Sequence, residues 1–263
     1  MPSRSRRWWR RPRQRSEGFV LNERLAFTNP KVQRLRRLLG RRSARSEEGA
    51  FVVEGAVLIA EAIVAGWLIE SEFVAPDTAT VSDAPVFELA PGVLERVATT
   101  ERPQPNLAIV QVRSMGPDLV DCSFVMVADR VSDPGNLGTI LRSSEAAGAD
   151  AVVLTPGSVD PLNPKVVRAS AGALFHVPVA VAQLVDLAAA GLRLIGTSSH
   201  HGIRHTEFDW SGRIAIVLGN EAHGLADVAP IDEWVRIEHH GRGESLNVAM
   251  AGTILAFEAV RQR

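Results

Sequence analysis

Three segments in the second half of the chain carry polar side chains of the kind that bind ligands and position reacting groups. They are ADRVSDPGNLGTILRSSEAAGAD from Ala128, AIVLGNEAHGL from Ala215 and GRGESLNVAMAGTILAFEAV from Gly241. Each reads as a strand or strand end that runs into a loop with glycine, asparagine or serine, and two of them then enter a helix. In an α/β sheet, ligands bind beyond the carboxyl ends of the strands. The pattern therefore predicts a binding site assembled from these loops.

Each segment taken alone also has a simpler explanation. In the first, we expect Asn136 to cap the following helix, and Arg142 inside that helix could be an ordinary surface residue. In the second, Gly219 allows close approach of backbone to a ligand and Glu221 puts a carboxylate at a loop start, but a turn explains both. In the third, Ser245 could simply cap the helix that follows.

The elements around these segments predict an α/β fold with a buried parallel sheet. Apolar runs alternate with helical patterns, and strands that are apolar on both faces are typical of a sheet covered on both sides. The predicted strands are FVMVA, AVVLT, HVPVAV, LRLIGT, IAIVLG and WVRI, and the predicted helices lie at Leu137–Ala147, Lys165–Leu174, Leu184–Ala190 and Leu246–Val260.

The first half predicts a smaller α/β unit. Val32, Leu35, Leu38 and Leu39 recur at helical spacing, and a strand and helix follow in FVVEGAVLIAEAIVAG, closed by Gly66. Short strand patterns follow at Glu72–Ala75, Val86–Leu89 and Leu107–Val112, with a helix near Val93–Ala98. We expect a disordered basic tail at 1–16, an α/β domain at 17–113, a linker at 114–122, where Gly116-Pro117-Asp118 breaks regular structure, and a second domain at 123–263.

Charge is distributed unevenly along the 263 residues, whose net charge is −1. Residues 1–45 carry 14 arginines and Lys31 against two glutamates, which gives about +13 and leaves about −14 for the rest. A basic arm on an acidic body favours nucleic acid as a partner, although a solvated tail is the alternative. The arginines on the first helix are the candidate RNA-binding residues: Arg34, Arg36, Arg37, Arg41 and Arg42.

Composition also limits the class of protein. The longest apolar stretch contains Glu61 and is shorter than the roughly 20 residues that a bilayer requires, so we expect no membrane span. The single cysteine, Cys122, excludes an intramolecular disulfide framework and agrees with a cytoplasmic location. Histidines cluster at His200, His201 and His205 and again at His239 and His240, without a zinc-binding spacing, and we expect no metal site.

In their order and spacing, the three segments resemble motifs 1, 2 and 3 of the SpoU/TrmH family of S-adenosylmethionine-dependent RNA ribose 2′-O-methyltransferases, within the SPOUT superfamily. The similarity covers roughly Phe124 to Gln262. The first half resembles the substrate-binding domain that precedes the catalytic domain in 23S ribosomal RNA methyltransferases, through NPKVQRLRRLL, FVVEGAVLIAEAI and a strand that ends at Val74-Ala75. No G-x-G-x-x-G follows a strand, so the usual Rossmann cofactor loop is absent.

The resemblance implies roles for individual residues. Motif positions that act in catalysis in the family fall on Asn136, Arg142, Glu221, Ser245 and Asn247. Those that hold S-adenosylmethionine, largely through backbone, fall on Thr197 or Ser198, Gly219, Ile237 and Leu246. A guanidinium rarely gives up its proton, so we expect Arg142 to act as an electrostatic and phosphate-orienting group rather than as a base.

The resemblance also implies a deep trefoil knot and a homodimer formed through the C-terminal domain, in which the arginine of one subunit lies near the cofactor of the other. The implied substrate is RNA, with 23S ribosomal RNA first, transfer RNA as an alternative, and a non-catalytic RNA-binding or ribosome-assembly protein on the same fold as a second alternative. The sequence leaves open which nucleotide is modified, and whether the modification serves ribosome maturation or antibiotic resistance.

Overall fold

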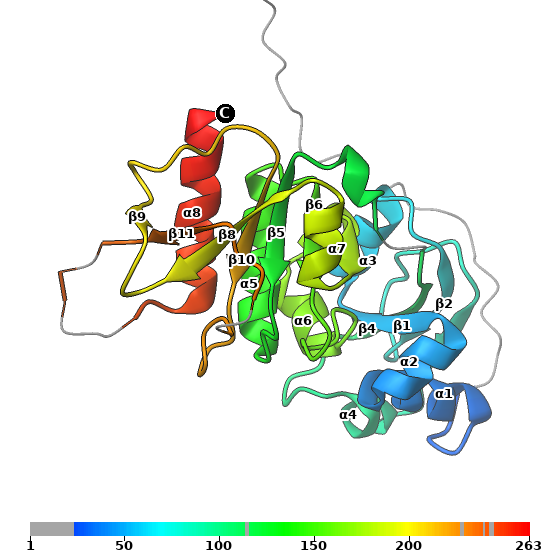
Figure 1. Cartoon of the computed structure of the whole chain (residues 1–263). Coiled ribbons are helices and arrows are strands. Elements are labelled where there is room, and N and C mark those ends of the chain that lie inside the picture. The colour runs from blue at the N-terminus through cyan, green and yellow to red at the C-terminus, as the bar shows by residue number, and fades with distance from the viewer. Residues whose placement is uncertain (1–23, 114–115, 227–228, 239, 242–244) are drawn as a thin grey trace, which may run out of the picture.

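The computed structural model describes residues 24–113, 116–226, 229–238, 240–241 and 245–263 (Figure 1). The basic tail predicted for 1–16 lies outside these residues. Two sheets organise the described chain, and the polypeptide completes the first before it begins the second. The expected α/β class with a parallel C-terminal sheet is confirmed.

The first sheet has four strands in the order β1-β4-β2-β3, with β4 antiparallel to both of its neighbours and β2 parallel to β3. Its elements are α1 (Pro30–Gly40), α2 (Arg42–Glu48), β1 (Ala50–Glu54), α3 (Ala56–Val64), β2 (Ile69–Val74), β3 (Val86–Glu88), α4 (Val93–Val97) and β4 (Asn106–Gln111). As the helical spacing predicts, α1 buries Val32, Leu35, Leu38 and Leu39.

The prediction of one basic helix through Arg42 is wrong. α1 ends at Gly40, Arg41 has an extended backbone with φ −126°, and α2 begins at Arg42. Glycine is a poor helix former and allows the chain to turn here. Arg41 and Arg42 consequently do not continue the basic side of α1.

The second sheet has seven strands in the order β7-β6-β5-β10-β8-β11-β9, and every neighbouring pair is parallel. After the short helix η1 (Leu119–Asp121), its elements are β5 (Phe124–Ala128), α5 (Pro134–Ala146), β6 (Ala151–Leu154), α6 (Pro164–Ala169), η2 (Ala173–Phe175), β7 (Val179–Val181), α7 (Leu184–Ala189), β8 (Arg193–Ser198), β9 (Ile203–Arg204), β10 (Ile214–Leu218), β11 (Glu233–Arg236) and α8 (Val248–Gln262). The two-residue strand β9 has no counterpart among the predicted elements.

The helix predicted over Lys165–Leu174 is also interrupted. α6 ends at Ala169 because Ala171 and Gly172 take left-handed backbone angles, with φ 49° and 98°. A side chain at position 172 would come within 2.9 Å of Glu61 Cγ, so glycine permits this close approach to α3. The chain then forms η2, which carries Phe175 toward the first sheet.

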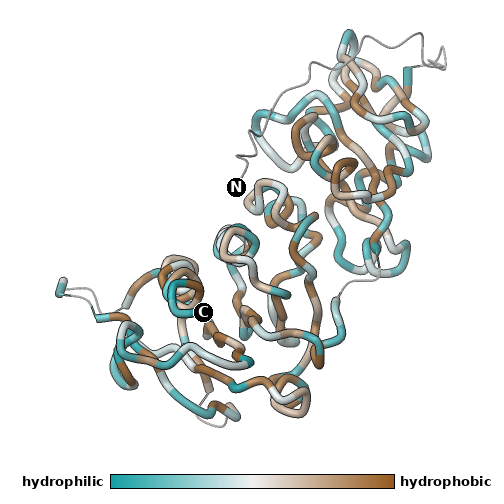
Figure 2. Tube along the Cα trace, turned by 90° about the horizontal axis from the view of Figure 1, so that it is seen from above, coloured by the Kyte–Doolittle hydropathy of each residue, from teal (hydrophilic) through white to brown (hydrophobic). Residues whose placement is uncertain are grey.

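One hydrophobic core joins the two parts of the chain. The ring of Trp67, which follows α3, packs edge-on between Phe51 and Phe175, with centroid distances of 5.6 Å to each, and Trp67 Nε1 donates a hydrogen bond to the Phe175 carbonyl at 3.1 Å. Figure 2 shows hydrophobic segments concentrated inside both parts of the molecule. The division at residues 114–122 stays a prediction, but the parts on either side of it are in direct contact through buried side chains.

Helices α5 and α8 pack together beside the second sheet, with Ser143 Oγ and Thr253 Oγ1 in a hydrogen bond of 2.6 Å (Figure 1). α8 also contacts β10, where a Cβ on Gly252 would lie 2.6 Å from Leu218 Cδ1. This packing sets the start of α8 beside the carboxyl end of β10. No helix among the described residues is both long and apolar enough to cross a membrane.

Candidate active site and RNA-binding surface

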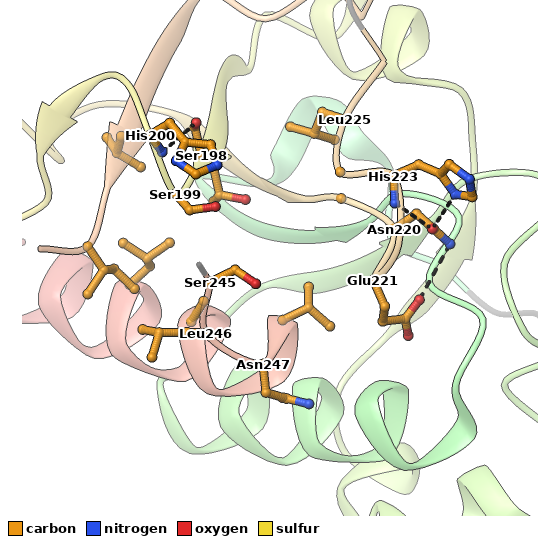
Figure 3. Close-up of a pocket in the computed structure, with 18 of the residues that line it drawn as sticks. Ser198, Ser199, His200, Asn220, Glu221, His223, Leu225, Ser245, Leu246 and Asn247 are labelled. Carbon is orange, nitrogen blue, oxygen red and sulfur yellow. Dashed lines mark hydrogen bonds between the residues drawn. The ribbon is translucent and has the colours of Figure 1, made fainter. Parts of the chain in front are cut away.

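A pocket of about 770 Å³ opens at the carboxyl edge of the second sheet. Figure 3 shows the Ser198–His200 segment facing the Asn220–His223 loop, with the start of α8 below them. The pocket is lined by Asn136, residues 197–201, residues 219–225, Trp234, Val235, Ile237, residues 245–248, Ala251 and Leu255. All five residues predicted to hold the cofactor lie in this lining, as do four of the five predicted catalytic residues; Arg142 does not.

Glu221 connects the second motif loop to the first. Its Oε2 accepts hydrogen bonds from the backbone N–H and the hydroxyl of Ser132 at 3.2 and 3.1 Å. Its Oε1 accepts from the Asp133 backbone N–H at 3.1 Å and from Asn136 Nδ2 at 3.0 Å. Partial burial raises the pKa of Glu221, but these hydrogen bonds, led by Asn136, outweigh it and lower the pKa to about 2. The side chain is therefore an ionised brace across the pocket mouth.

Asn136 extends this connection to the third motif. While its Nδ2 donates to Glu221, its Oδ1 accepts from Asn247 Nδ2 at 2.9 Å. Asn247 Oδ1 in turn accepts from the backbone N–H groups of Ala249 and Met250 in the first turn of α8. A continuous set of hydrogen bonds thus runs from Glu221 to α8, and we call Glu221, Asn136 and Asn247 the motif relay.

The expected cap at Asn136 is wrong, and the alternative explanation of Ser245 as a cap does not hold either. Asp133, not Asn136, caps α5: its Oδ1 accepts from the Asn136 N–H at 2.8 Å, and Pro134 occupies the first helical position. Proline favours that position because it has no N–H to leave unsatisfied. Likewise Asn247, not Ser245, caps α8. The Ser245 hydroxyl makes no hydrogen bond within the part of the chain that the structure describes, so it is available to a ligand.

Gly219 is required by the close approach of its own loop. A Cβ on Gly219 would lie 2.5 Å from the carbonyl carbon of Gly224, well inside contact distance. Asn220 and Gly224 exchange two backbone hydrogen bonds, of 3.1 and 2.9 Å, which close a tight turn. The turn directs Leu225 into one wall of the pocket.

The opposite wall is built from the loop after β8. Ser198 Oγ lies 2.9 Å from His201 Nδ1 and accepts from the backbone N–H of His200, which orders the loop. The His201 ring packs on Trp234 with centroids 4.7 Å apart. The sequence patterns did not single out Trp234. Its contact with His201 depends on the pairing of β8 with β11, which brings the two residues together.

Arg142 projects from the exposed side of α5 and lies outside the pocket of its own chain. It makes no hydrogen bond or ion pair with any residue that the structure describes. Its neighbour Ser143 is buried against α8. Within one chain, Arg142 is therefore not brought together with the other predicted catalytic residues.

The five predicted RNA-binding arginines differ in how free their charges are. Arg34 is tied to Glu48 and to both carboxylate oxygens of Glu70, which raises the pKa of Arg34 and lowers that of Glu48. Arg37 also contacts Glu48, at 3.3 Å. Two of these arginines are thus largely neutralised by intramolecular partners.

The remaining three are placed differently from one another. Arg36 is exposed and stands over the Phe27 ring at 5.5 Å, on which Arg96 packs more closely, at 3.7 Å. Arg41 is exposed, and Arg42 Nη1 donates to the Ser158 carbonyl of the second part of the chain at 3.4 Å. Arg96 is a further basic surface residue, and the charge pattern of the first helix does not include it.

The described histidines do not lie in clusters of metal-binding side chains. No group of three or more His, Cys, Asp or Glu side chains in the described ranges is arranged to hold an ion. His200, His201 and His223 line the pocket instead, and His223 Nδ1 lies 3.1 Å from Asn220 Oδ1. His239, predicted in a second cluster, lies outside the described residues.

Comparison with known proteins decides the family. The model of the SpoU rRNA methylase family matches residues 123–257, the part of the chain that contains the pocket. The chain belongs to the SpoU rRNA methylase family. In this SpoU family member, residues 29–108 also match the MRM3-like substrate-binding domain. The resemblance inferred from the three motifs is therefore confirmed, together with the family of the N-terminal extension.

Relatives of this SpoU family member match it over nearly its whole length. It is 32% identical to the 23S rRNA (guanosine(2553)-2′-O)-methyltransferase RlmP of Bacillus subtilis, over 87% of this chain and 95% of the relative. It is 31% identical to the 23S rRNA (uridine(2479)-2′-O)-methyltransferase of Streptomyces viridochromogenes, over 95% and 96%. A crystal structure of an AdoMet-bound rRNA methyltransferase from Sinorhizobium meliloti shares the fold with a TM-score of 0.80 at 31% identity, covering 91% of this chain and 97% of that one.

Proposed function

We propose that this protein transfers a methyl group from S-adenosylmethionine to the 2′-hydroxyl of a ribose in 23S ribosomal RNA. The observation that carries the proposal is the motif relay, which joins three separate loops around one pocket in a member of the SpoU family. Two relatives that align over most of the chain are named as 23S rRNA 2′-O-methyltransferases, which favours ribosomal over transfer RNA.

The pocket has the size and chemistry for S-adenosylmethionine. Its volume, about 770 Å³, lies in the range of small-molecule sites. Apolar side chains suited to an adenine ring come from Leu225, Val235, Leu246 and Leu255, while Thr197, Ser198 and Gly219 present polar backbone. When bound, S-adenosylmethionine supplies an electrophilic methyl group on a positively charged sulfur.

The polar residues divide into bracing and substrate-facing groups. A carboxylate with a pKa of about 2 whose two oxygens already accept five hydrogen bonds is a poor proton acceptor, so Glu221 braces the loops. Asn136 and Asn247 each keep one unused N–H to orient a ribose, and Ser245 keeps its whole hydroxyl. Positioning of reacting groups, here the 2′-oxygen in line with the methyl group, can lower a barrier by about 7–11 kcal/mol.

The exposed face of α8 supports a homodimer. Leu246, Met250, Ile254, Phe257 and Val260 are 39–55% exposed and lie at one edge of the pocket and along the helix that follows. A contiguous apolar surface of this kind is typical of a protein interface. The proposed occupant is α8 of a second copy, and the dimer brings Arg142 of one subunit to the pocket of the other, where it stabilises the developing oxyanion and orients a phosphate.

We also propose three further features, for which family membership is the support. The C-terminal chain forms the deep trefoil knot, supported by the fold shared with the Sinorhizobium meliloti enzyme. Residues 17–113 bind RNA and residues 123–263 catalyse, supported by the two family models that match within those ranges. The enzyme works in the cytoplasm, where its proposed ribosomal substrate is found.

Mapping of 2′-O-methyl groups tests the proposal. Ribosomal and transfer RNA from cells with and without this protein are compared, and the purified protein is incubated with unmodified 23S rRNA and labelled S-adenosylmethionine. We expect one ribose in 23S rRNA to lose its methyl group in the deletion strain and to regain it in vitro. Methylation found only in transfer RNA would replace the substrate, and S-adenosylmethionine binding without transfer to any RNA would refute the activity.

A further inference from the structure

Arg130 has a backbone conformation that its residue type disfavours, beside the pocket. It follows the carboxyl end of β5 with φ 54°, in the left-handed region. Long side chains rarely adopt this region because Cβ approaches the carbonyl oxygen, whereas glycine adopts it freely. An arginine at such a position calls for a reason beyond the turn itself.

The surrounding loops hold this backbone in place on both sides. The Arg130 N–H donates to Thr155 Oγ1 at 3.0 Å, and its carbonyl accepts from Asn220 Nδ2 at 2.8 Å. Asn220 lines the pocket. Conformations that are disfavoured and yet fixed by several neighbours occur mainly at ligand-binding and active sites.

The guanidinium is also held in one orientation. Its Nε and Nη2 donate to Asp129 Oδ2 at 3.2 and 3.1 Å, and Asp129 is buried, with its Oδ1 accepting from Thr155 Oγ1 at 2.7 Å. Arg130 Nη1 has no partner among the described residues, and the side chain is 43% exposed. One edge of the guanidinium is thus fixed by a buried carboxylate while the other faces solvent.

Two neighbouring residues connect Arg130 to the loops of the pocket. Two residues further on, Ser132 donates to Glu221 at the mouth of the pocket, and Asn220 connects Arg130 to the opposite loop. A guanidinium with two N–H groups on one edge matches the oxygens of a phosphodiester. We propose that Arg130 binds a phosphodiester group of the RNA beside the target nucleotide. This inference rests on the proposed function and extends it to a residue of the first motif segment that is not among the five predicted catalytic positions.

A purely structural role makes a different prediction. If Arg130 served only to neutralise Asp129, its loss would destabilise the fold and leave RNA affinity unchanged. Replacement by glycine separates the two roles because glycine relieves the left-handed backbone. The test variant is therefore Arg130→Gly, with Arg130→Asn as a second variant, since asparagine tolerates the same backbone and can still donate to Asp129.

The experiment measures RNA binding, S-adenosylmethionine binding and thermal unfolding for the wild type and both variants. The control is Arg261→Ala, which removes an exposed arginine that is likewise paired with a carboxylate, Glu258, at the far end of α8. With a 23S rRNA fragment that the wild type binds, we expect both Arg130 variants to weaken binding about tenfold. The slope of log affinity against log salt should fall by about 0.7, the value for one lost phosphate contact on single-stranded RNA. S-adenosylmethionine affinity should stay within about twofold.

RNA affinity and salt slope equal to the wild type in either folded variant would overturn the inference, and so would an equal loss in the control. This outcome is distinct from failure of the proposed function. A wild type that binds the RNA fragment but transfers no methyl group refutes the proposed activity, while the binding comparison still decides the role of Arg130. A wild type that binds no RNA refutes both.

Discussion

Replacement of Glu221 by glutamine should loosen the pocket without removing any side-chain volume. In the wild type, one ionised carboxylate accepts four hydrogen bonds from Ser132, Asp133 and Asn136. Glutamine keeps one oxygen and places an NH₂ group against N–H donors, so at least one backbone hydrogen bond and the charge assistance of the others are lost. Because the distances are 3.0–3.2 Å and the group is exposed, we expect a cost of about 1.5 kcal/mol, the lower end of the range for charged hydrogen bonds.

The pKa of Glu221 gives the pH dependence of this cost. A shift from 4.5 to about 2 corresponds to about 3 kcal/mol for a carboxylate shielded from water, and exposure to solvent reduces this to about 1.5 kcal/mol. Because the pKa is lower in the folded state, the unfolded state binds more protons at acid pH. The stabilisation is therefore complete above about pH 5 and disappears as the pH falls toward 2.

Thermal unfolding at pH 3, 5 and 7 checks this prediction. We expect the midpoint of Glu221→Gln to lie about 3–6 °C below the wild type at pH 7, with a smaller difference at pH 3. S-adenosylmethionine affinity should fall about tenfold, because the variant must order its loops on binding. Glu145→Gln on the exposed side of α5 is the control, since that carboxylate has no hydrogen bond to any described residue. A Glu221→Gln variant that matches the control in unfolding and affinity would refute the bracing role.

Three further changes test separate parts of the proposal. Arg142→Ala should reduce single-turnover methylation by about 10²–10³-fold, as loss of a charge-stabilising donor does. S-adenosylmethionine affinity, measured by calorimetry, should be retained. Near-normal turnover would contradict the role of Arg142 in stabilising the oxyanion. Phe257→Glu should convert the dimer to monomers in analytical ultracentrifugation. The control is Val57→Glu on α3, where the valine is 78% exposed, and it should leave the dimer intact. A Phe257→Glu variant that is still a dimer would place the interface elsewhere. Arg36→Ala should lower the salt slope of RNA binding by about 0.7. Arg34→Ala should change the slope less, because Glu48 and Glu70 already neutralise Arg34. Equal slopes for the two variants would contradict the inference that only Arg36 keeps its charge available.

The sheet and the assembly of the site were predictable because both follow from local patterns. Apolar runs such as β5 and β10 are buried along their whole length, as parallel central strands require. Since the carboxyl ends of parallel strands share one edge, the loops that follow them meet there. This rule brings Glu221 to Asn136, although they lie 85 residues apart in the sequence.

The identity of the helix caps was not predictable from composition. Asp133 and Asn136 are both good capping residues, as are Ser245 and Asn247, so residue type alone does not choose between them. The choice depends on where the helix starts, and Pro134 fixes that start for α5. The consequence is functional: Asn136 is freed from capping and joins the motif relay.

Charge patterns along the sequence say even less about which arginines are free to bind RNA. Arg34 and Arg36 are two residues apart, yet Arg34 is neutralised by Glu70, which is 36 residues away in sequence on β2, while Arg36 faces solvent over Phe27. A helical pattern shows that both lie outside the core. Only the tertiary contacts between α1 and the sheet decide which of them keeps its charge available.

The same limit applies to Arg45, which counts toward the positive charge of residues 1–45 but is not free to bind a partner. It is 4% exposed, donates to the Leu38 carbonyl at 2.7 Å and forms an ion pair of 2.6 Å with Asp160, in the loop after β6. Removal of either partner would leave a buried charge unpaired, which is strongly destabilising. Together with Trp67 on Phe175, this ion pair holds the first part of the chain against the second. The fold therefore sets the spacing between the proposed RNA contacts of α1 and the pocket. If both sites bind one RNA, as we propose, that RNA must have a matching separation between its docking element and its target ribose.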